Sequence, residues 1–194
     1  SFNSISTHVS IEAKSNALAL SKKSKLIPNM IKINKDAKFS KSDGYLFIGR
    51  QEKRKNFNFF NMLSKEDDFR ENKFIAITNK TISTDNIEFF IKPTESEKYE
   101  IFQRTNIYLA LNTKRESFGI TLLEAVNNGN LAITSDLPAF KNVLINSHVV
   151  FENKSYSSLV SLLSSISVSN IEKLWNNQFS DLNNYDLDKN MEKF

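Results

Sequence analysis

Short apolar runs recur along the chain between residues 45 and 151, and polar residues or glycines bound them. Runs of this kind are too short to be typical helices, and their apolar residues do not alternate with polar ones. Such runs are typical of strands buried on both faces of a parallel sheet. The predicted strands are Tyr45–Ile48, Lys73–Thr78, Ile87–Ile91, Ile107–Leu111, Leu131–Ser135 and Val149–Phe151.

The segments between these runs carry apolar residues three or four positions apart, which is the spacing of amphipathic helices. Regular alternation of buried strands with helices argues for an α/β fold with a doubly wound, mostly parallel sheet. The predicted helices are one with Phe57, Phe60, Met62 and Leu63 as its apolar residues, Glu95–Gln103, one from near Gly119 to the Asn128-Gly129 stop, Pro138–Leu144, Tyr156–Ile166 and Ser169–Trp175.

The connection between the second and third predicted strands is unusually short. Only eight residues, Asn79–Asn86, separate them, whereas a parallel crossover normally needs a dozen or so. A tight crossover without a helix and a local hairpin both fit this spacing, so the pairing of these two strands stays open.

The two ends of the chain read differently from the alternating middle. Ile5–Ser10 is strand-like, and Ser10 is placed to cap a helix over Ile11–Leu20. Lys32–Asp43 is polar and without period, as expected of a linker, and a new domain is predicted to start at Gly44. The tail Gln178–Phe194 is polar and is expected to end partway through an element.

Composition narrows the classes of protein. A chain of 194 residues with 40% hydrophobic content can bury a full core, and the absence of cysteine excludes disulfides and thiolate metal sites. No apolar run approaches the roughly 20 residues that span a bilayer, so we expect a soluble protein. The net charge of +4 is spread along the chain, which fits a binder of phosphates or of an acidic membrane surface better than a dedicated nucleic-acid protein.

The clearest chemical signal is the strand, polar loop and helix that run from Ile107 to Gly129. The first turn of a helix has N–H groups without internal partners and the positive end of the dipole, so it favours an anion. Glu116 precedes this turn and Glu124 lies about one turn inside it. The ordinary alternative is that Phe118 and its apolar neighbours form a core face while both glutamates are solvated surface charges.

A second signal follows the first predicted strand, which ends in Gly49-Arg50, with Lys55 five residues after the arginine. The glycine is expected to let the backbone turn tightly, and both cations can reach a diphosphate lying over the carboxyl edge of the sheet. Taken alone, Arg50 and Lys55 are more often ordinary surface charges.

The segment Glu116-x-Phe118-Gly119-Ile120-x-x-x-Glu124-Ala125, followed by Gly129 and a strand, resembles the signature of the retaining GT-B glycosyltransferases, especially glycosyltransferase family 4. Gly49-Arg50 and Lys55 are similar to that family's diphosphate-binding pair. The resemblance implies a Rossmann-like, nucleotide-sugar-binding C-terminal domain over residues 44–194, with residues 1–43 as the end of an N-terminal domain and an interdomain linker. Asn112-Thr113 and Asn130 depart from the family's prolines, and we expect these changes to affect loop stiffness more than ligand chemistry.

By this resemblance the protein transfers a sugar from a nucleotide diphosphate sugar, with a UDP-sugar favoured, to a glycan or lipid-linked acceptor in bacterial surface polysaccharide synthesis. Glu116 would face the donor sugar, backbone N–H groups of Phe118, Gly119 and Ile120 would meet sugar and phosphate, and Glu124 would bind the ribose. Gly49, Arg50 and Lys55 would hold the leaving diphosphate, so that no metal or other cofactor is needed.

The same resemblance implies a cytoplasmic enzyme whose acceptor binds through an N-terminal domain, with peripheral association at the inner face of the membrane as an open option. Two other classes of function remain alternatives. One is a noncatalytic module that binds nucleotide sugars or a partner, and the other is an unrelated basic α/β domain that binds nucleic acid.

Overall fold

The main body of the protein is a six-stranded sheet in which every pair of neighbouring strands is parallel. The structure is a computed structural model, and it describes residues 6–8, 24–26 and 29–190. The sheet order is β5-β4-β3-β6-β7-β8. All six predicted strands are confirmed to within one residue at each end. Their bounds are β3 Gly44–Ile48, β4 Lys73–Thr78, β5 Glu88–Ile91, β6 Ile107–Ala110, β7 Leu131–Ser135 and β8 Val149–Phe151.

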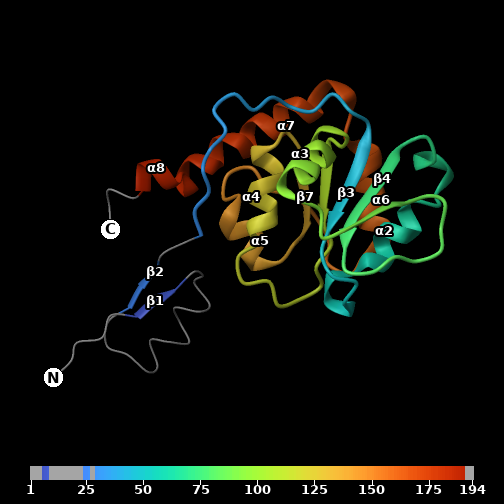
Figure 1. The fold of residues 1–194 in the computed structure, drawn as a ribbon, viewed down its shortest axis with the longest axis horizontal. Coiled ribbons are helices and arrows are strands. Elements are labelled where there is room, and N and C mark those ends of the chain that lie inside the picture. The colour runs from blue at the N-terminus through green and yellow to red at the C-terminus, as the bar shows by residue number, and fades with distance from the viewer. Residues whose placement is uncertain (1–5, 9–23, 27–28, 191–194) are drawn as a thin grey trace.

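Helices cover both faces of this sheet, which confirms the doubly wound α/β fold (Figure 1). One face carries α3 (Glu95–Gln103), α4 (Ile120–Asn127) and α5 (Pro138–Val143). The other face carries α2 (Phe57–Leu63) and α6 (Tyr156–Ser165), and α7 (Val168–Asp181) crosses the edge between the two layers. The short helices are η1 Lys53–Lys55, η2 Asp67–Phe69, η3 Leu182–Tyr185 and α8 Leu187–Asn190.

The short connection after β4 is a crossover without a helix. β4 and β5 pair in parallel, with Ile75 opposite Glu88, so the hairpin alternative is excluded. The chain between them forms turns and bends, and the side chain of Asn86 donates to the carbonyl of Ser64 at 2.6 Å. This contact holds the short connection against the end of α2.

The direction of winding reverses between β3 and β6, which lie side by side with Tyr45 opposite Ile107. The chain leaves β3 toward β4 on one side, and it leaves β6 toward β7 on the other. The loops that follow these two strands, residues 49–56 and 111–119, therefore diverge at the carboxyl edge. In open α/β sheets this divergence leaves the crevice in which ligands bind.

The prediction for the last long helix was wrong about its end. α7 continues past Trp175 to Asp181, and η3 follows at once. Gln178, which made the tail look polar, is fully buried, and its carboxamide both accepts from the N–H of Ala132 and donates to its carbonyl, each at 2.8 Å. The Gln178 side chain thus makes the two hydrogen bonds that a neighbouring strand would make to Ala132. The pairing of β7 with β8 begins one residue later, at Ile133.

Residues 29–43 have no long element of their own but pack on the main body. Phe39 is buried with its ring 6.1 Å from that of Trp175, and the N–H of Ser40 donates to the carbonyl of Gly129 at 2.9 Å. Ile31 forms an isolated bridge with Asp186, which joins this segment to the end of the described chain.

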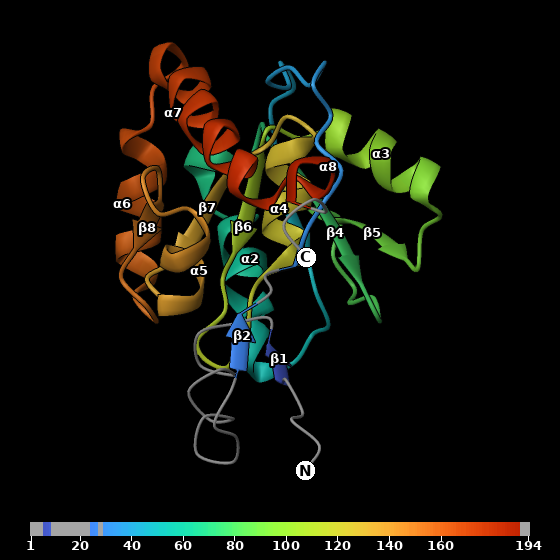
Figure 2. The same ribbon diagram turned by 90° about the vertical axis from the view of Figure 1, so that its left-hand side faces the viewer.

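Farther toward the N-terminus, β1 (Ser6–His8) and β2 (Ser24–Leu26) form a separate parallel pair (Figure 2). The predicted helix over Ile11–Leu20 and its Ser10 cap lie outside the described residues. The domain boundary at Gly44 stays a prediction.

The predicted stop of α4 has the geometry of a Schellman motif. Gly129 has φ +91°, its N–H donates to the carbonyl of Val126, and the N–H of Asn130 donates to that of Ala125. A Cβ at position 129 would lie 2.3 Å from the carbonyl oxygen of Lys38. Glycine is therefore required here both by the backbone angle and by the close passage of the preceding segment.

We predict that Gly129→Ala lowers the free energy of unfolding by about 2 kcal/mol or more, because it adds left-handed strain and a clash with Lys38. Gly49→Ala is the matched control, since φ there is not in the left-handed region and an added Cβ would lie 3.5 Å from its nearest neighbours. Urea denaturation of the two variants and the wild type measures the difference. Equal losses in both variants would contradict this account of Gly129.

Candidate functional site

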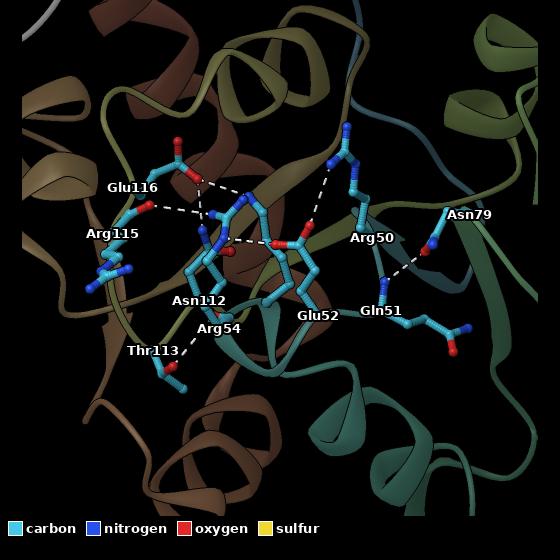
Figure 3. Close-up of polar contacts among 10 residues, drawn as sticks. Arg50, Gln51, Glu52, Arg54, Asn79, Asn112, Thr113, Arg115 and Glu116 are labelled. Atoms are coloured by element: carbon cyan, nitrogen blue, oxygen red, sulfur yellow. Dashed lines mark hydrogen bonds and ion pairs between the residues drawn. The ribbon is translucent and has the colours of Figure 1, made fainter.

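The two loops that diverge at the carboxyl edge are joined by hydrogen bonds (Figure 3). The N–H of Thr113 donates to the carbonyl of Arg54 at 2.8 Å, and the Arg54 guanidinium donates to the carbonyl of Arg115 at 3.3 Å. The first loop is also held from its other side, because the N–H of Gln51 donates to Asn79 Oδ1 at 2.9 Å. These contacts fix the loop after β3 between the loops after β4 and β6.

At the centre of this edge lies an ion pair between Lys55 and Glu116, with Nζ 2.9 Å from Oε2. Only 19% and 14% of the two side chains are exposed, so the pair is well shielded from water. The same carboxylate oxygen accepts from Asn112 Nδ2 at 2.7 Å. Two of the residues predicted for the site, from segments 61 positions apart, are thus in direct contact.

Glu116 is held in its charged form. Burial by itself raises the pKa of this carboxyl group, but hydrogen bonds from Lys55, the Phe118 N–H and Asn112, together with the charge of Lys55, outweigh burial and leave the pKa below its ordinary value. A charged carboxylate only accepts hydrogen bonds, so Glu116 is suited to receive them from hydroxyl groups.

Asn112, one of the departures from the family pattern, contacts a residue predicted for the site. Its side chain donates directly to Glu116, and its carbonyl accepts from Ser135 Oγ at 2.5 Å. Asn130, the other departure, is fully buried and joins Thr105 to the carbonyl of Phe102. A proline at either position would lack these side-chain contacts.

The start of α4 presents backbone donors at the same edge of the sheet. Gly119 is the N-cap residue with φ +86°, and no side chain caps the helix. Within the described residues, no acceptor contacts the N–H groups of Gly119 and Ile120. The Phe118 N–H is directed at Glu116 instead, and the buried Phe118 ring packs edge-on against Tyr185.

Glu124, one turn inside α4, has a lysine partner of its own. Lys98 Nζ in α3 lies 2.8 Å from Glu124 Oε2. Sequence reasoning did not single out Lys98, although a signal was present. The first turn of a helix that follows a parallel strand lies at the carboxyl edge, so a cation there is close to the predicted site.

The remaining predicted residues lie at the rim. Arg50 is exposed over 76% of its side chain and makes a loose contact of 3.5 Å with Glu52, which also pairs with Arg54 at 2.9 Å. The backbone of Gly49 lies outside the left-handed region. The absence of a side chain at Gly49 instead leaves room beside Lys55.

Over residues 6–8, 24–26 and 29–190, no group of three or more histidine, aspartate or glutamate side chains is placed to hold a metal ion. None of the described helices has both the length and the apolar composition needed to cross a membrane.

Comparison with known proteins identifies the family and the fold of this chain. Residues 67–176, more than half of the chain, match the family described as glycosyl transferases group 1. A phosphatidyl-myo-inositol mannosyltransferase of Mycobacterium tuberculosis is 38% identical over 58 residues, which are 30% of this chain and 15% of the mannosyltransferase.

Solved structures share the fold at low sequence identity. The pneumococcal O-GlcNAc transferase GtfA, in complex with UDP and GlcNAc, has a TM-score of 0.72 and 15% identity over 97% of this chain. An Escherichia coli protein described as trehalose-6-phosphate, bound with UDP-2-fluoro glucose, has a TM-score of 0.74 and 10% identity over 98% of this chain. The similarity spans 43% and 59% of those two chains, so this chain corresponds to about half the length of each.

The pKa of Glu116 leads to a prediction about acid stability. Because that pKa is lower in the folded state than the ordinary 4.5, Glu116 stabilises the fold above about pH 4.5 and loses this contribution as the pH falls through the folded-state pKa. Between about pH 5 and pH 3, the free energy of unfolding should fall less steeply in Glu116→Gln than in the wild type.

Urea denaturation at a series of pH values measures these slopes. Glu71→Gln, which makes the same change of charge at a side chain that is 92% exposed, is the control. A slope in Glu116→Gln equal to that of the wild type would show that Lys55 and Asn112 do not hold the carboxylate charged.

Proposed function

Because the chain belongs to the glycosyl transferases group 1 family, we propose that it binds the nucleotide diphosphate sugar donor of a glycosyltransferase. The observation that supports this most is the shielded Lys55–Glu116 pair beside the open start of α4. It puts a cation for phosphate, a charged acceptor for sugar hydroxyls and free backbone donors at one edge of the sheet. Each of these matches one chemical part of a nucleotide sugar.

In this proposal the diphosphate lies between Lys55, Arg50 and the first turn of α4. An ammonium group has three donors, so Lys55 can bind a phosphate oxygen while keeping its contact with Glu116. Arg50 is exposed enough to move toward the ligand, and a guanidinium can make two parallel bonds to phosphate. The two cations would stabilise the charge that develops on the leaving diphosphate, which is the electrostatic work of a divalent cation in other enzymes.

The two glutamates have separate roles. Glu116, in the loop ahead of α4, is nearest to the place of the reacting sugar, where its charge orients the sugar hydroxyls. Glu124 lies farther along α4 and accepts hydrogen bonds from the ribose. Gly49 allows close approach of the ligand, and Gly119 and Ile120 supply backbone N–H groups. The Phe118 N–H acts indirectly, by donating a hydrogen bond to Glu116.

The identity of the nucleotide, the acceptor and the cellular site is also a proposal. UDP is the favoured nucleotide, and UDP or a UDP-sugar is bound in the two similar structures. We propose metal-independent transfer to a glycan or lipid-linked acceptor in bacterial surface polysaccharide synthesis, at a cytoplasmic site with peripheral membrane association left open. The acceptor would bind through a second domain, with residues 1–43 as its end and the interdomain linker.

Isothermal titration calorimetry of this chain with UDP, GDP and ADP tests the donor site. We expect one of the three to bind, and we expect Arg50→Ala and Lys55→Ala to weaken that binding, since each charge-assisted contact to phosphate contributes roughly 1.5 to 3 kcal/mol. Arg70→Ala removes an exposed arginine that precedes β4, at the opposite edge of the sheet, and is the control. Wild-type affinity in both site variants would refute the assignment of this loop, and binding of an oligonucleotide but of no nucleotide would favour the nucleic-acid alternative.

A second prediction separates the two glutamates by ligand. Glu124→Gln should weaken bare UDP and a UDP-sugar equally, because both ligands carry the ribose. Glu116→Gln should leave the affinity for bare UDP nearly unchanged and reduce the additional affinity for the UDP-sugar, because it removes only the charge that faces the sugar. Titrations of both ligands into both variants measure this difference, and the reverse pattern would show that the two roles are exchanged.

A further inference from the structure

The ion pair between Lys98 and Glu124 has features that an ordinary surface pair lacks. It joins two helices across 26 positions of sequence, and only 18% of the Lys98 side chain and 30% of the Glu124 side chain are exposed. An exposed pair typically contributes little because water screens it, but a pair this shielded fixes the geometry of both groups.

The backbone at Lys98 is firmly held. Thr94 and Glu97 form a capping box at the start of α3, in which the N–H of Thr94 donates to Glu97 Oε2 at 2.7 Å. The N–H of Lys98 donates to the carbonyl of Thr94 at 2.9 Å. The first turn of α3 is thereby fixed at the carboxyl edge, and Lys98 reaches from it to Glu124.

A lysine is electrostatically unfavourable in this turn when α3 is considered alone. The positive end of the helix dipole favours acidic side chains such as Glu95 and Glu97, and it disfavours a cation. The contact with Glu124 offsets this disadvantage. The position of Lys98 is therefore explained by α4 and its carboxylate rather than by the stability of α3.

Lys98 occupies only one of the two carboxylate oxygens. Its bond goes to Oε2, and within the part of the chain that the structure describes, Oε1 has no partner. A carboxylate can accept about four hydrogen bonds, so a ligand can bind Glu124 without displacing Lys98. At the other end of the site, Lys55 likewise contacts Oε2 of Glu116, which also accepts from Asn112.

We propose that Lys98 is a positioning residue, which holds Glu124 so that its free oxygen accepts a hydrogen bond from a ribose hydroxyl of the bound nucleoside diphosphate. The proposal rests on the donor site proposed above. It goes further in assigning to α3 a part in ribose recognition, through a lysine that does not itself contact the ligand.

The test compares each nucleotide with its analogue that lacks the ribose hydroxyls. The probes are UDP, GDP and ADP and their 2′,3′-dideoxy forms, titrated calorimetrically into the wild type, Lys98→Met, Lys98→Arg and Glu124→Gln. In Lys98→Met the affinity for the complete nucleotide should fall by about tenfold, while the affinity for the dideoxy form stays unchanged, because only the former uses Glu124. Lys98→Arg should retain most of the wild-type affinity for the complete nucleotide. When Glu124→Gln is already present, adding Lys98→Met should not lower that affinity further.

Lys41→Met is the matched control, because it breaks another Lys–Glu pair, with Glu172, and that pair is much more exposed. Equal weakening of both forms of the nucleotide in Lys98→Met would mean a structural role or a direct ligand contact, and tighter binding would mean that Lys98 competes with the ribose. Either result would overturn the proposal.

The same titrations separate this inference from the proposed function. If the wild type binds none of the six ligands, the proposed donor site is refuted, and so is the role of Lys98 that depends on it. If the wild type binds UDP and its dideoxy form equally, donor binding stands but ribose recognition by Glu124 and Lys98 does not. If the wild type prefers the complete nucleotide and Lys98→Met keeps this preference, only the role of Lys98 is refuted.

Discussion

The reversal of winding between β3 and β6 is the constraint on which the site depends. Two adjacent parallel strands send their chains in opposite directions, so the loops that follow them diverge at the carboxyl edge, which is where ligands bind in open α/β sheets. The loop after β3 supplies Lys55, and the loop after β6 supplies Glu116 and the open start of α4. The chemistry of the site is thus placed by the topology of the sheet before any individual contact is considered.

Charge is balanced locally at this edge. Each of the two glutamates next to α4 is paired with a lysine from a neighbouring segment, Glu116 with Lys55 and Glu124 with Lys98. A shielded carboxylate without a partner would tend to take up a proton and would then be a poorer acceptor for hydroxyl groups. Lys55 helps to keep the Glu116 carboxylate charged, and each lysine orients its partner carboxylate while leaving acceptor capacity for a ligand.

The opposite edge of the sheet is held by buried polar side chains that take the place of backbone partners. The carboxamide of Gln178 pairs with the backbone of Ala132 where β8 does not yet reach, and Asn130 connects the end of α3 to Thr105. Buried peptide groups left without partners would each be costly, roughly 1 to 3 kcal/mol. These side chains hold the amino ends of the strands in place, so that the sheet supports the loops at its carboxyl edge.

The sequence by itself determined the strands, most of the helices and the α/β class, because apolar periodicity is a local property that burial imposes on each element. Their spacing relative to a strand end or a helix start made Glu116, Glu124, Arg50 and Lys55 candidates, and the resemblance to the glycosyltransferase signature favoured them over ordinary surface charges. Only the tertiary structure decided how far α7 extends, that Asn112 contacts Glu116, and that Lys98 reaches Glu124. The physical reason is that a polar side chain carries no sequence mark of its partner. Gln178 looks like a solvated tail residue until the fold brings it to Ala132, 46 positions away.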